Sequence, residues 1–165
     1  FGFPLAFIYT MTTVGRVGGV WVSGYMISKG MSPFKARRIT MLIFALLVVP
    51  IVFAQSKGVT TWGAVCLIAL AASSHQAWSA NIFTTVSDAF PKKAVSSVTG
   101  IGGMAGAVMG AFISLIAGKI LGHFKGLGHI ETGYVVMFAI AGSAYLVAWI
   151  IMTVFAPKIK KVELD

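Results

Sequence analysis

The sequence predicts an all-α membrane protein with five transmembrane helices. Of its 165 residues, 58% are hydrophobic and only 10% are charged, and the mean hydropathy is +0.91. Soluble domains contain about 45–50% apolar and about 25% charged residues, so a chain of this composition cannot bury its apolar side chains inside a small globule. Lipid is therefore the expected solvent. The apolar stretches do not alternate with a period of two, which favours helices over the strands of a barrel.

Five apolar stretches are each close to the roughly 20 residues that a helix needs to cross a bilayer. They cover approximately residues 4–27, 39–54, 61–87, 94–121 and 134–156. In lipid, only helices and closed barrels satisfy their own backbone hydrogen bonds, so each stretch is expected to be a membrane-spanning helix. Pro50 lies inside the second stretch and is expected to distort it.

The connectors between the stretches alternate in charge, which predicts the orientation of the chain. The first and third connectors and the tail at 157–165 are the more basic ones, whereas the second carries only Lys57 and the fourth carries Lys125 with Glu131. The excess of Lys and Arg on cytoplasmic loops then places the first and third connectors and the tail in the cytoplasm and the chain start outside. We therefore expect a multi-pass protein of the cell membrane, or of the inner membrane in a bacterium, in contact with membrane lipid. Almost all basic residues lie in short connectors and not on one amphipathic face, which argues against nucleic acid as the partner despite the net charge of +9.

Arg16 is the one arginine placed midway along an apolar stretch. A charge at that depth costs roughly 2.5–3.5 kcal/mol, so such residues usually face a polar cavity, a partner or a ligand. The planar guanidinium suits a carboxylate, with which it forms two parallel hydrogen bonds. Arg16 is therefore a candidate substrate-binding residue. The alternatives are an arginine that extends to the interface, or one paired with a carboxylate elsewhere in the protein.

The third stretch is unusually polar for a membrane helix. Its polar side chains are Ser73, Ser74, His75, Gln76, Trp78, Ser79, Asn81, Thr84 and Thr85. Helical spacing groups them into adjoining stripes, which predicts a helix that lines an aqueous cavity. The alternative is hydrogen bonding between helices alone, at about 0.6 kcal/mol for each contact. His75 titrates near neutral pH when unperturbed, although a lone histidine is more often a hydrogen-bonding residue.

Glycines repeat at intervals of four residues in two stretches. Gly102, Gly106 and Gly110 form one series, and Gly15 and Gly19 form another. Small residues at this spacing allow membrane helices to approach closely, so close helix crossings are expected at both places.

The sequence contains no recognisable catalytic or metal-binding set. The four acidic residues lie in or beside connectors or in the tail, and Cys66 is the single cysteine. The three histidines lack the spacing of metal ligands. We therefore expect no enzymatic activity, no metal and no cofactor.

Three segments resemble parts of major facilitator superfamily transporters, in the anion:cation symporter branch that includes bacterial hexuronate (glucuronate/galacturonate) transporters. Residues 18–38 contain glycines followed by Lys29, Lys35, Arg37 and Arg38, and resemble the end of the eighth helix and its basic loop. Residues 75–93, with the run His-Gln-Ala-Trp-Ser and then Ser-Asp-Ala-Phe-Pro-Lys-Lys, resemble the tenth helix and its exit. Residues 95–106 resemble the start of the eleventh helix.

This resemblance implies a fold of twelve helices in two halves, of which residues 1–156 would be helices eight to twelve. The start at Phe1, without methionine, fits an internal position, and the N-terminal half would be the missing partner. In the family, substrate binds between the halves and alternating access moves it across the membrane. The resemblance places His75, Gln76 and Ser79 where the tenth helix faces the cavity, and Met104 where the eleventh does. Arg16 is added from its charge alone.

The expected function is thus secondary active transport of a sugar-acid anion, such as a hexuronate, coupled to protons. In this interpretation Arg16 attracts the carboxylate, and His75, Gln76 and Ser79 hold the hydroxyl groups. The alternatives are another organic anion such as an aldonate, a facilitator without coupling, and a non-transporting membrane assembly subunit.

Overall fold

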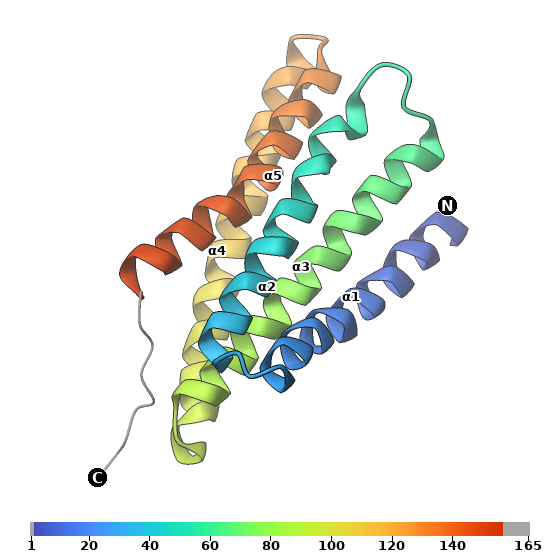
Figure 1. Ribbon diagram of the computed structural model, residues 1–165. Coiled ribbons are helices and arrows are strands. Elements are labelled where there is room, and N and C mark those ends of the chain that lie inside the picture. Colours follow the sequence, from blue (N-terminus) through green and yellow to red (C-terminus); the bar gives the residue numbers. More distant parts are fainter. Residues whose placement is uncertain (1, 157–165) are drawn as a thin grey trace.

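The computed structural model describes residues 2–156, which contain five α-helices, one short 3-10 helix and no strand within that range. The elements are α1 (Gly2–Ser28), α2 (Pro33–Val48), η1 (Val49–Gln55), α3 (Thr61–Ala89), α4 (Lys92–Gly126) and α5 (Ile130–Phe155). Successive helices run in opposite directions, and the connectors alternate between the two ends of the bundle (Figure 1). The prediction of an all-helical chain with five helices is confirmed. The predicted cytoplasmic tail at 157–165 lies outside the described residues.

Local sequence signals account for where several helices begin and end. The Thr60 hydroxyl accepts a hydrogen bond from the Gly63 N–H at 3.1 Å and so caps the start of α3. Pro33 is the first residue of α2, where its missing N–H is tolerated. After α1, Gly30 has a φ of 91°, a conformation that glycine adopts without steric cost and that reverses the chain toward α2.

Pro50 changes the type of helix in the second predicted span. The α-helix ends at Val48, and Val49–Gln55 continue as a 3-10 helix with Pro50 in its first turn. Proline lacks the N–H that the α-helical ladder needs at this point, and its ring crowds the preceding turn. The predicted distortion is therefore confirmed. The whole segment 33–55 is longer than the predicted span of 39–54.

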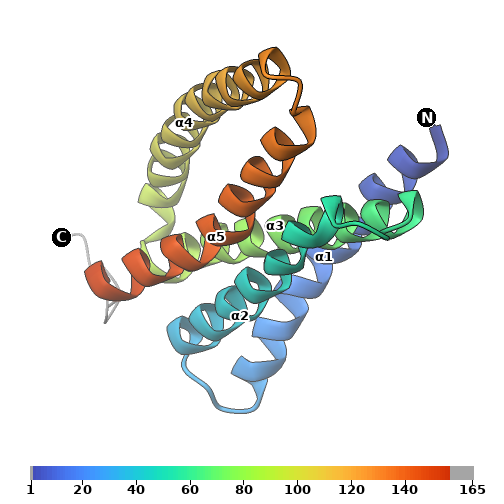
Figure 2. The ribbon, with the colours of Figure 1, turned by 90° about the horizontal axis from the view of Figure 1, so that it is seen from above.

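The core lies where α2, α3 and α5 meet. Met41, Ala45 and Trp78 are buried together, with α5 side chains packed against them. The Trp78 indole N–H donates a hydrogen bond to the Met41 carbonyl oxygen at 2.8 Å, which joins α3 to α2. A second cluster joins η1 to α3 through Ile51 and Ala71. α3 thus occupies the centre of the bundle, as the view from above shows (Figure 2).

α1 packs closely against α3 at the first glycine series. A Cβ atom added to Gly19 would lie 2.6 Å from the Ala77 Cα, and one added to Gly15 would overlap Ser73. The buried Asn81 side chain donates a hydrogen bond from Nδ2 to the Gly19 carbonyl oxygen at 3.0 Å. Such close approach is possible only without side chains at these two positions, so the predicted crossing at Gly15 and Gly19 is confirmed.

The second glycine series behaves differently. α4 has no buried residue, and a Cβ atom added to Gly102, Gly106 or Gly110 would meet nothing within 4 Å. Figure 2 shows α4 standing apart from the other helices along much of its length. The predicted close crossing at this series is therefore wrong for the residues described. The spacing was compatible with close packing but did not provide a partner helix.

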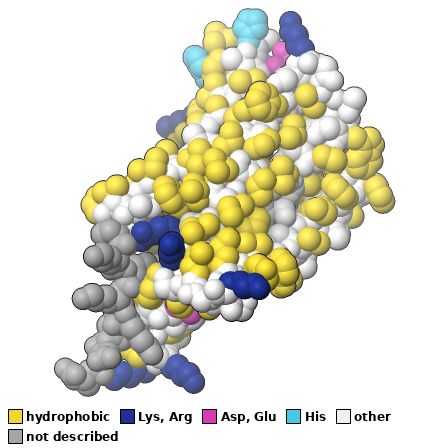
Figure 3. All heavy atoms as spheres, viewed as in Figure 1, with side chains coloured by type: hydrophobic (Ala, Val, Ile, Leu, Met, Phe, Trp, Pro, Cys, Tyr) yellow, Lys and Arg dark blue, Asp and Glu magenta, His cyan; other side chains and the backbone are white. Residues whose placement is uncertain are grey.

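Four segments are long and apolar enough to cross a membrane, by length and composition. They are α1, α2 with η1, α4 and α5. α3 has sufficient length and only one charged residue, Asp88, so its polar side chains lower its hydropathy below that of the other four. Hydrophobic side chains cover most of the face in Figure 3, and the charged side chains gather mainly toward the ends. The arrangement is compatible with a multi-pass membrane protein in which α3 is shielded by its neighbours.

The two ends of the bundle differ in charge. The basic end, formed by the α1–α2 and α3–α4 connectors, carries Lys29, Lys35, Arg37, Arg38, Lys92 and Lys93 with Asp88. The opposite end, formed by the α2–α3 and α4–α5 connectors and the adjoining turns, carries Lys57, Lys119, Lys125 and Glu131. The folded chain thus keeps the asymmetry on which the predicted orientation rests.

This asymmetry predicts which cysteine an impermeant reagent reaches in intact cells. In a Cys66→Ser background, Lys57→Cys is expected to react with a membrane-impermeant maleimide, whereas Lys93→Cys is expected to react only after permeabilisation. Both lysines are exposed, so accessibility of the side chain does not separate them. The opposite labelling pattern would reverse the orientation.

Candidate functional site

The polar residues of α3 divide into two groups according to whether the protein itself satisfies them. In the first group, Ser74 donates to the Leu70 carbonyl oxygen at 2.8 Å and Thr84 donates to the Ala80 carbonyl oxygen at 3.0 Å. Thr85 likewise donates to the Asn81 carbonyl oxygen at 2.7 Å. Serine and threonine often bond to the preceding turn of their own helix in this way. These hydroxyls, the Trp78 indole and the Nδ2 of Asn81 are engaged in structural hydrogen bonds, whereas the buried Oδ1 of Asn81 has no partner among the described residues.

The second group consists of Ser73, Gln76 and Ser79, which we call the polar row. All three are partly buried, and within residues 2–156 none of them makes a hydrogen bond. A spacing of three residues keeps them on one side of α3. Partly buried polar groups normally find a partner, so the polar row has hydrogen-bonding capacity for water, a ligand or another part of the protein.

Ser79 also lines a groove between α3 and α4, which we call the α3–α4 groove. The groove has a volume of about 290 Å³. Its wall on α4 contains Thr99 and three glycines, and its wall on α3 is largely apolar beside Ser79. The lining residues are Ser79, Ile82, Phe83, Val86, Val98, Thr99, Gly102, Gly103 and Gly106. The absence of side chains on the glycines leaves the groove open, and two hydroxyl groups are its polar features.

His75 lies one turn before Ser79 on α3 and is held by an aromatic cluster. Its Nδ1 is hydrogen-bonded to the Tyr145 hydroxyl of α5, and the two rings meet edge to face with centroids 5.9 Å apart. The Trp78 ring contacts the same tyrosine at 5.5 Å. The Nε2 atom of His75 makes no hydrogen bond within the described part of the chain. The imidazole is therefore fixed through one nitrogen and keeps the other for a further partner.

Tyr145 was not among the predicted site residues. The sequence did contain a signal for it, because tyrosine in membrane helices prefers the interface, and this residue lies well inside α5. A tyrosine at that depth needs a hydrogen-bond partner for its hydroxyl group, and His75 supplies one.

Arg16 lies on α1, exposed, and has no hydrogen-bond or ion-pair partner among residues 2–156. It directly follows Gly15, which packs against Ser73. The guanidinium is therefore attached at the depth of the polar row, although it does not line the α3–α4 groove. The structure brings Arg16 to the level of Ser73 on α3, without a hydrogen bond between them among the described residues.

Met104 is placed differently from the other predicted site residues. It is 67% exposed and is not among the residues that line the α3–α4 groove. Thr99 and the neighbouring glycines of α4 occupy that position instead. Residues 104 and 106 are two apart, so they point to nearly opposite sides of a helix.

A network at the basic end was also missed by sequence reasoning. The Arg37 Nε lies 3.2 Å from Asp88 Oδ2, and the same guanidinium donates to the Ser23 hydroxyl. Arg38 donates to the Ala156 carbonyl oxygen, and the Trp149 indole N–H donates to the Arg38 carbonyl oxygen at 2.9 Å. These contacts tie α1, α2, α3 and α5 together at one end of the bundle.

The described residues contain no group of three histidine, cysteine or acidic side chains that would hold a metal ion. The polar groups that line the groove are neutral, and the guanidinium of Arg16 lies on α1 outside it. Such a set is suited to hydrogen-bonding and ion-pairing a small polar anion. Comparison of the chain with family models, with curated proteins and with solved structures finds no match.

Proposed function

We propose that the chain forms part of a secondary transporter that carries a sugar-acid anion, such as a hexuronate, by alternating access coupled to protons. The observation that supports this proposal most strongly is the polar row. It consists of neutral hydrogen-bonding groups that have no partner within residues 2–156. They lie on α3, whose neighbouring helices are apolar. Binding sites for small molecules have this character, with mostly apolar walls and a few polar groups that fix orientation.

The chemistry of a sugar acid matches the residues available. The guanidinium of Arg16 offers a planar pair of donors to a carboxylate, and Gln76 and Ser79 both donate to and accept from hydroxyl groups. His75 adds its free ring nitrogen. Ser79 lies among the apolar walls of the α3–α4 groove, where a hydrogen bond to a ligand is stronger than in water.

The packing of α4 is compatible with movement. α4 has no buried residue, so few buried contacts hold it in place. Elements that move in conformational changes usually have few such contacts. The resemblance to the major facilitator superfamily, in which helices move around a central site, agrees with this reading. The resemblance supports the proposal together with the polar row.

Two further candidates follow from specific observations. The Arg16 guanidinium would bind the carboxylate of an aldonate or another organic anion equally well. The first alternative is therefore a transporter of such an anion, with or without proton coupling. The exposed apolar surface of α4, including Ile101, Met104 and Phe112, favours contact with another chain, as in a membrane assembly subunit.

The experiment is uptake of labelled glucuronate by liposomes that contain the full-length protein, with and without an inward proton gradient. Gradient-dependent uptake that galacturonate competes would support the proposal. Uptake that does not depend on the gradient would contradict proton coupling. Uptake of aldonates alone would contradict the assignment of a hexuronate as the substrate. No uptake of any organic anion would favour the assembly subunit. Arg16→Ala is expected to weaken uptake by at least tenfold, since a hydrogen bond to a charged group contributes about 1.5–3 kcal/mol.

The two groups of polar residues on α3 predict different effects of substitution. Gln76→Ala and Ser79→Ala are each expected to raise the KM for uptake about fivefold, because each removes a hydrogen bond of about 1 kcal/mol to substrate. Ser74→Ala and Thr84→Ala are matched controls, since these hydroxyls bond to their own helix. The controls are expected to leave KM unchanged. Equal effects on KM in both groups would show that the polar row contributes to helix packing and not to substrate binding.

A further inference from the structure

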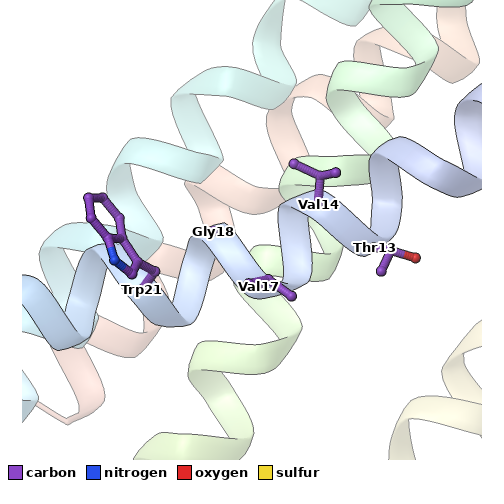
Figure 4. A pocket seen from close by; sticks show the side chains of 5 residues that line it. All are labelled: Thr13, Val14, Val17, Gly18 and Trp21. Atoms are coloured by element: carbon purple, nitrogen blue, oxygen red, sulfur yellow. The ribbon is translucent and has the colours of Figure 1, made fainter.

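The side of α1 that faces away from α3, which we call the outer face, carries an apolar concavity. It has a volume of about 390 Å³ and is lined by Thr13, Val14, Val17, Gly18 and Trp21 (Figure 4). The helical period places these residues opposite the glycines that pack against α3. A Cβ atom added to Gly18 would meet nothing within 4 Å, so the missing side chain at this position contributes to the hollow.

An aromatic ladder continues from this concavity toward the basic end. The rings of Trp21 and Tyr25 are stacked, with centroids 5.8 Å apart and an interplanar angle of 17°. The Lys29 Nζ lies 5.6 Å from the centroid of the Tyr25 ring. The spacing of four residues places the three side chains one above the other along the helix. Trp21 and Tyr25 are 68% and 53% exposed, so the described chain leaves both rings uncovered.

The charge at the end of this ladder has no counterpart in the described chain. Lys29 has no ion-pair partner among residues 2–156. Asp88, the acidic residue of the basic end, is engaged by Arg37. The other charged residues at this end are positive, so the local field favours an anion beside Lys29.

We propose that the outer face of α1 binds one anionic phospholipid. An acyl chain lies in the apolar concavity, Trp21 and Tyr25 lie at the level of the glycerol backbone, and Lys29 pairs with the phosphate. Aromatic rings of tryptophan and tyrosine favour this level of a bilayer, and lysine reaches the headgroups while its stem stays apolar. The helix rises about 6 Å from Tyr25 to Lys29, which is close to the thickness of one interfacial layer.

A lipid fits this surface better than a protein helix does. Lys29 lies just after the end of α1, at headgroup level, where the bilayer itself supplies an anion without any acidic side chain. A phospholipid supplies both the apolar chain and the negative charge, in the order in which the concavity and the lysine occur along α1. The proposal requires that the chain lies in a bilayer and does not depend on which substrate is transported.

The test uses the full-length protein in phosphatidylcholine vesicles that contain an equal fraction of either brominated phosphatidylglycerol or brominated phosphatidylcholine. Bromine on the acyl chains quenches nearby tryptophan, and the contribution of Trp21 is the difference between the wild type and Trp21→Phe. We expect phosphatidylglycerol to be preferred about fivefold at Trp21, which corresponds to about 1 kcal/mol for one lysine near an anionic group. Native mass spectrometry of retained phosphatidylglycerol gives a second readout that does not need Trp21→Phe.

Two pairs of variants separate the headgroup from the acyl chain. Lys29→Gln is expected to abolish the preference, whereas Lys35→Gln, at the same end, is expected to preserve it. Gly18→Leu is expected to reduce quenching by both lipids, whereas Gly118→Leu, an open position on α4, is expected to have no effect. Equal quenching by both lipids in the wild type, or a preference that survives Lys29→Gln, would overturn the proposal. Trp21 unquenched by either lipid would also overturn it and would indicate that protein covers the outer face.

Discussion

Gly19→Leu is expected to force α1 away from α3 and to destabilise the protein in detergent by about 1–3 kcal/mol, the usual range for overpacking. Loss of the hydrogen bond from Asn81 to the Gly19 carbonyl oxygen would add about 1 kcal/mol. The backbone of Ala77 lies only 2.6 Å from the position of the new Cβ atom, so a change of side-chain rotamer cannot relieve the overlap. The melting temperature of the purified protein measures the effect.

Gly24→Leu provides the matched control for this prediction. Gly24 belongs to the same helix, and a Cβ atom there would meet nothing within 4 Å. The control isolates the effect of a larger side chain on α1 from the effect of the crossing. A loss of stability that is equal at both positions would show that the contact of Gly19 with α3 is not what matters.

Arg37→Ala is expected to destabilise the protein by about 1.5–3 kcal/mol, because the guanidinium bonds both Asp88 and Ser23. The side chain of Arg37 is 11% exposed and that of Asp88 is 30% exposed, so water replaces the lost interactions incompletely. Removal of Arg37 also removes the polar links from α2 to α3 and to α1 at the basic end. Thermal unfolding in detergent again provides the measurement.

A double-mutant cycle with Asp88→Ala tests whether the ion pair carries this effect. The double variant is expected to be more stable than the sum of the two single changes predicts, since the second change removes a charge that the first left unpaired. Lys35→Ala, an exposed lysine on the same helix, is the control and is expected to change stability little. Strict additivity of Arg37→Ala and Asp88→Ala would contradict coupling between them.

The features of the fold that the sequence predicted correctly are those set by the backbone and by composition. Five apolar stretches became five helices, and Pro50 changed the helix type at its own position. Gly15 and Gly19 marked a real crossing, whereas the same spacing in α4 did not. The difference is physical, because a glycine series only permits close approach, and the partner helix must be supplied by the rest of the fold.

The candidate site was less predictable. The sequence identified α3 as the polar helix, but it did not separate Ser79 from Ser74. Whether a serine bonds to its own helix depends on its rotamer and its neighbours, which composition does not specify. The partnership of His75 with Tyr145 joins residues 70 positions apart, and no local pattern encodes such a contact. The ion pair of Arg37 with Asp88 was missed for the same reason.

The 3-10 segment at Pro50 has a consequence for the length of the second span. The 16 residues of α2 extend about 24 Å at 1.5 Å per residue, which is shorter than a hydrocarbon core of about 30 Å. The seven residues of η1 add about 14 Å at 2.0 Å per residue, whereas α-helical geometry would give them about 10.5 Å. The 3-10 geometry that Pro50 imposes therefore lengthens this span by about 3.5 Å. That is similar to the few ångströms by which cellular membranes differ in thickness, so the position of one proline sets which bilayer this span matches.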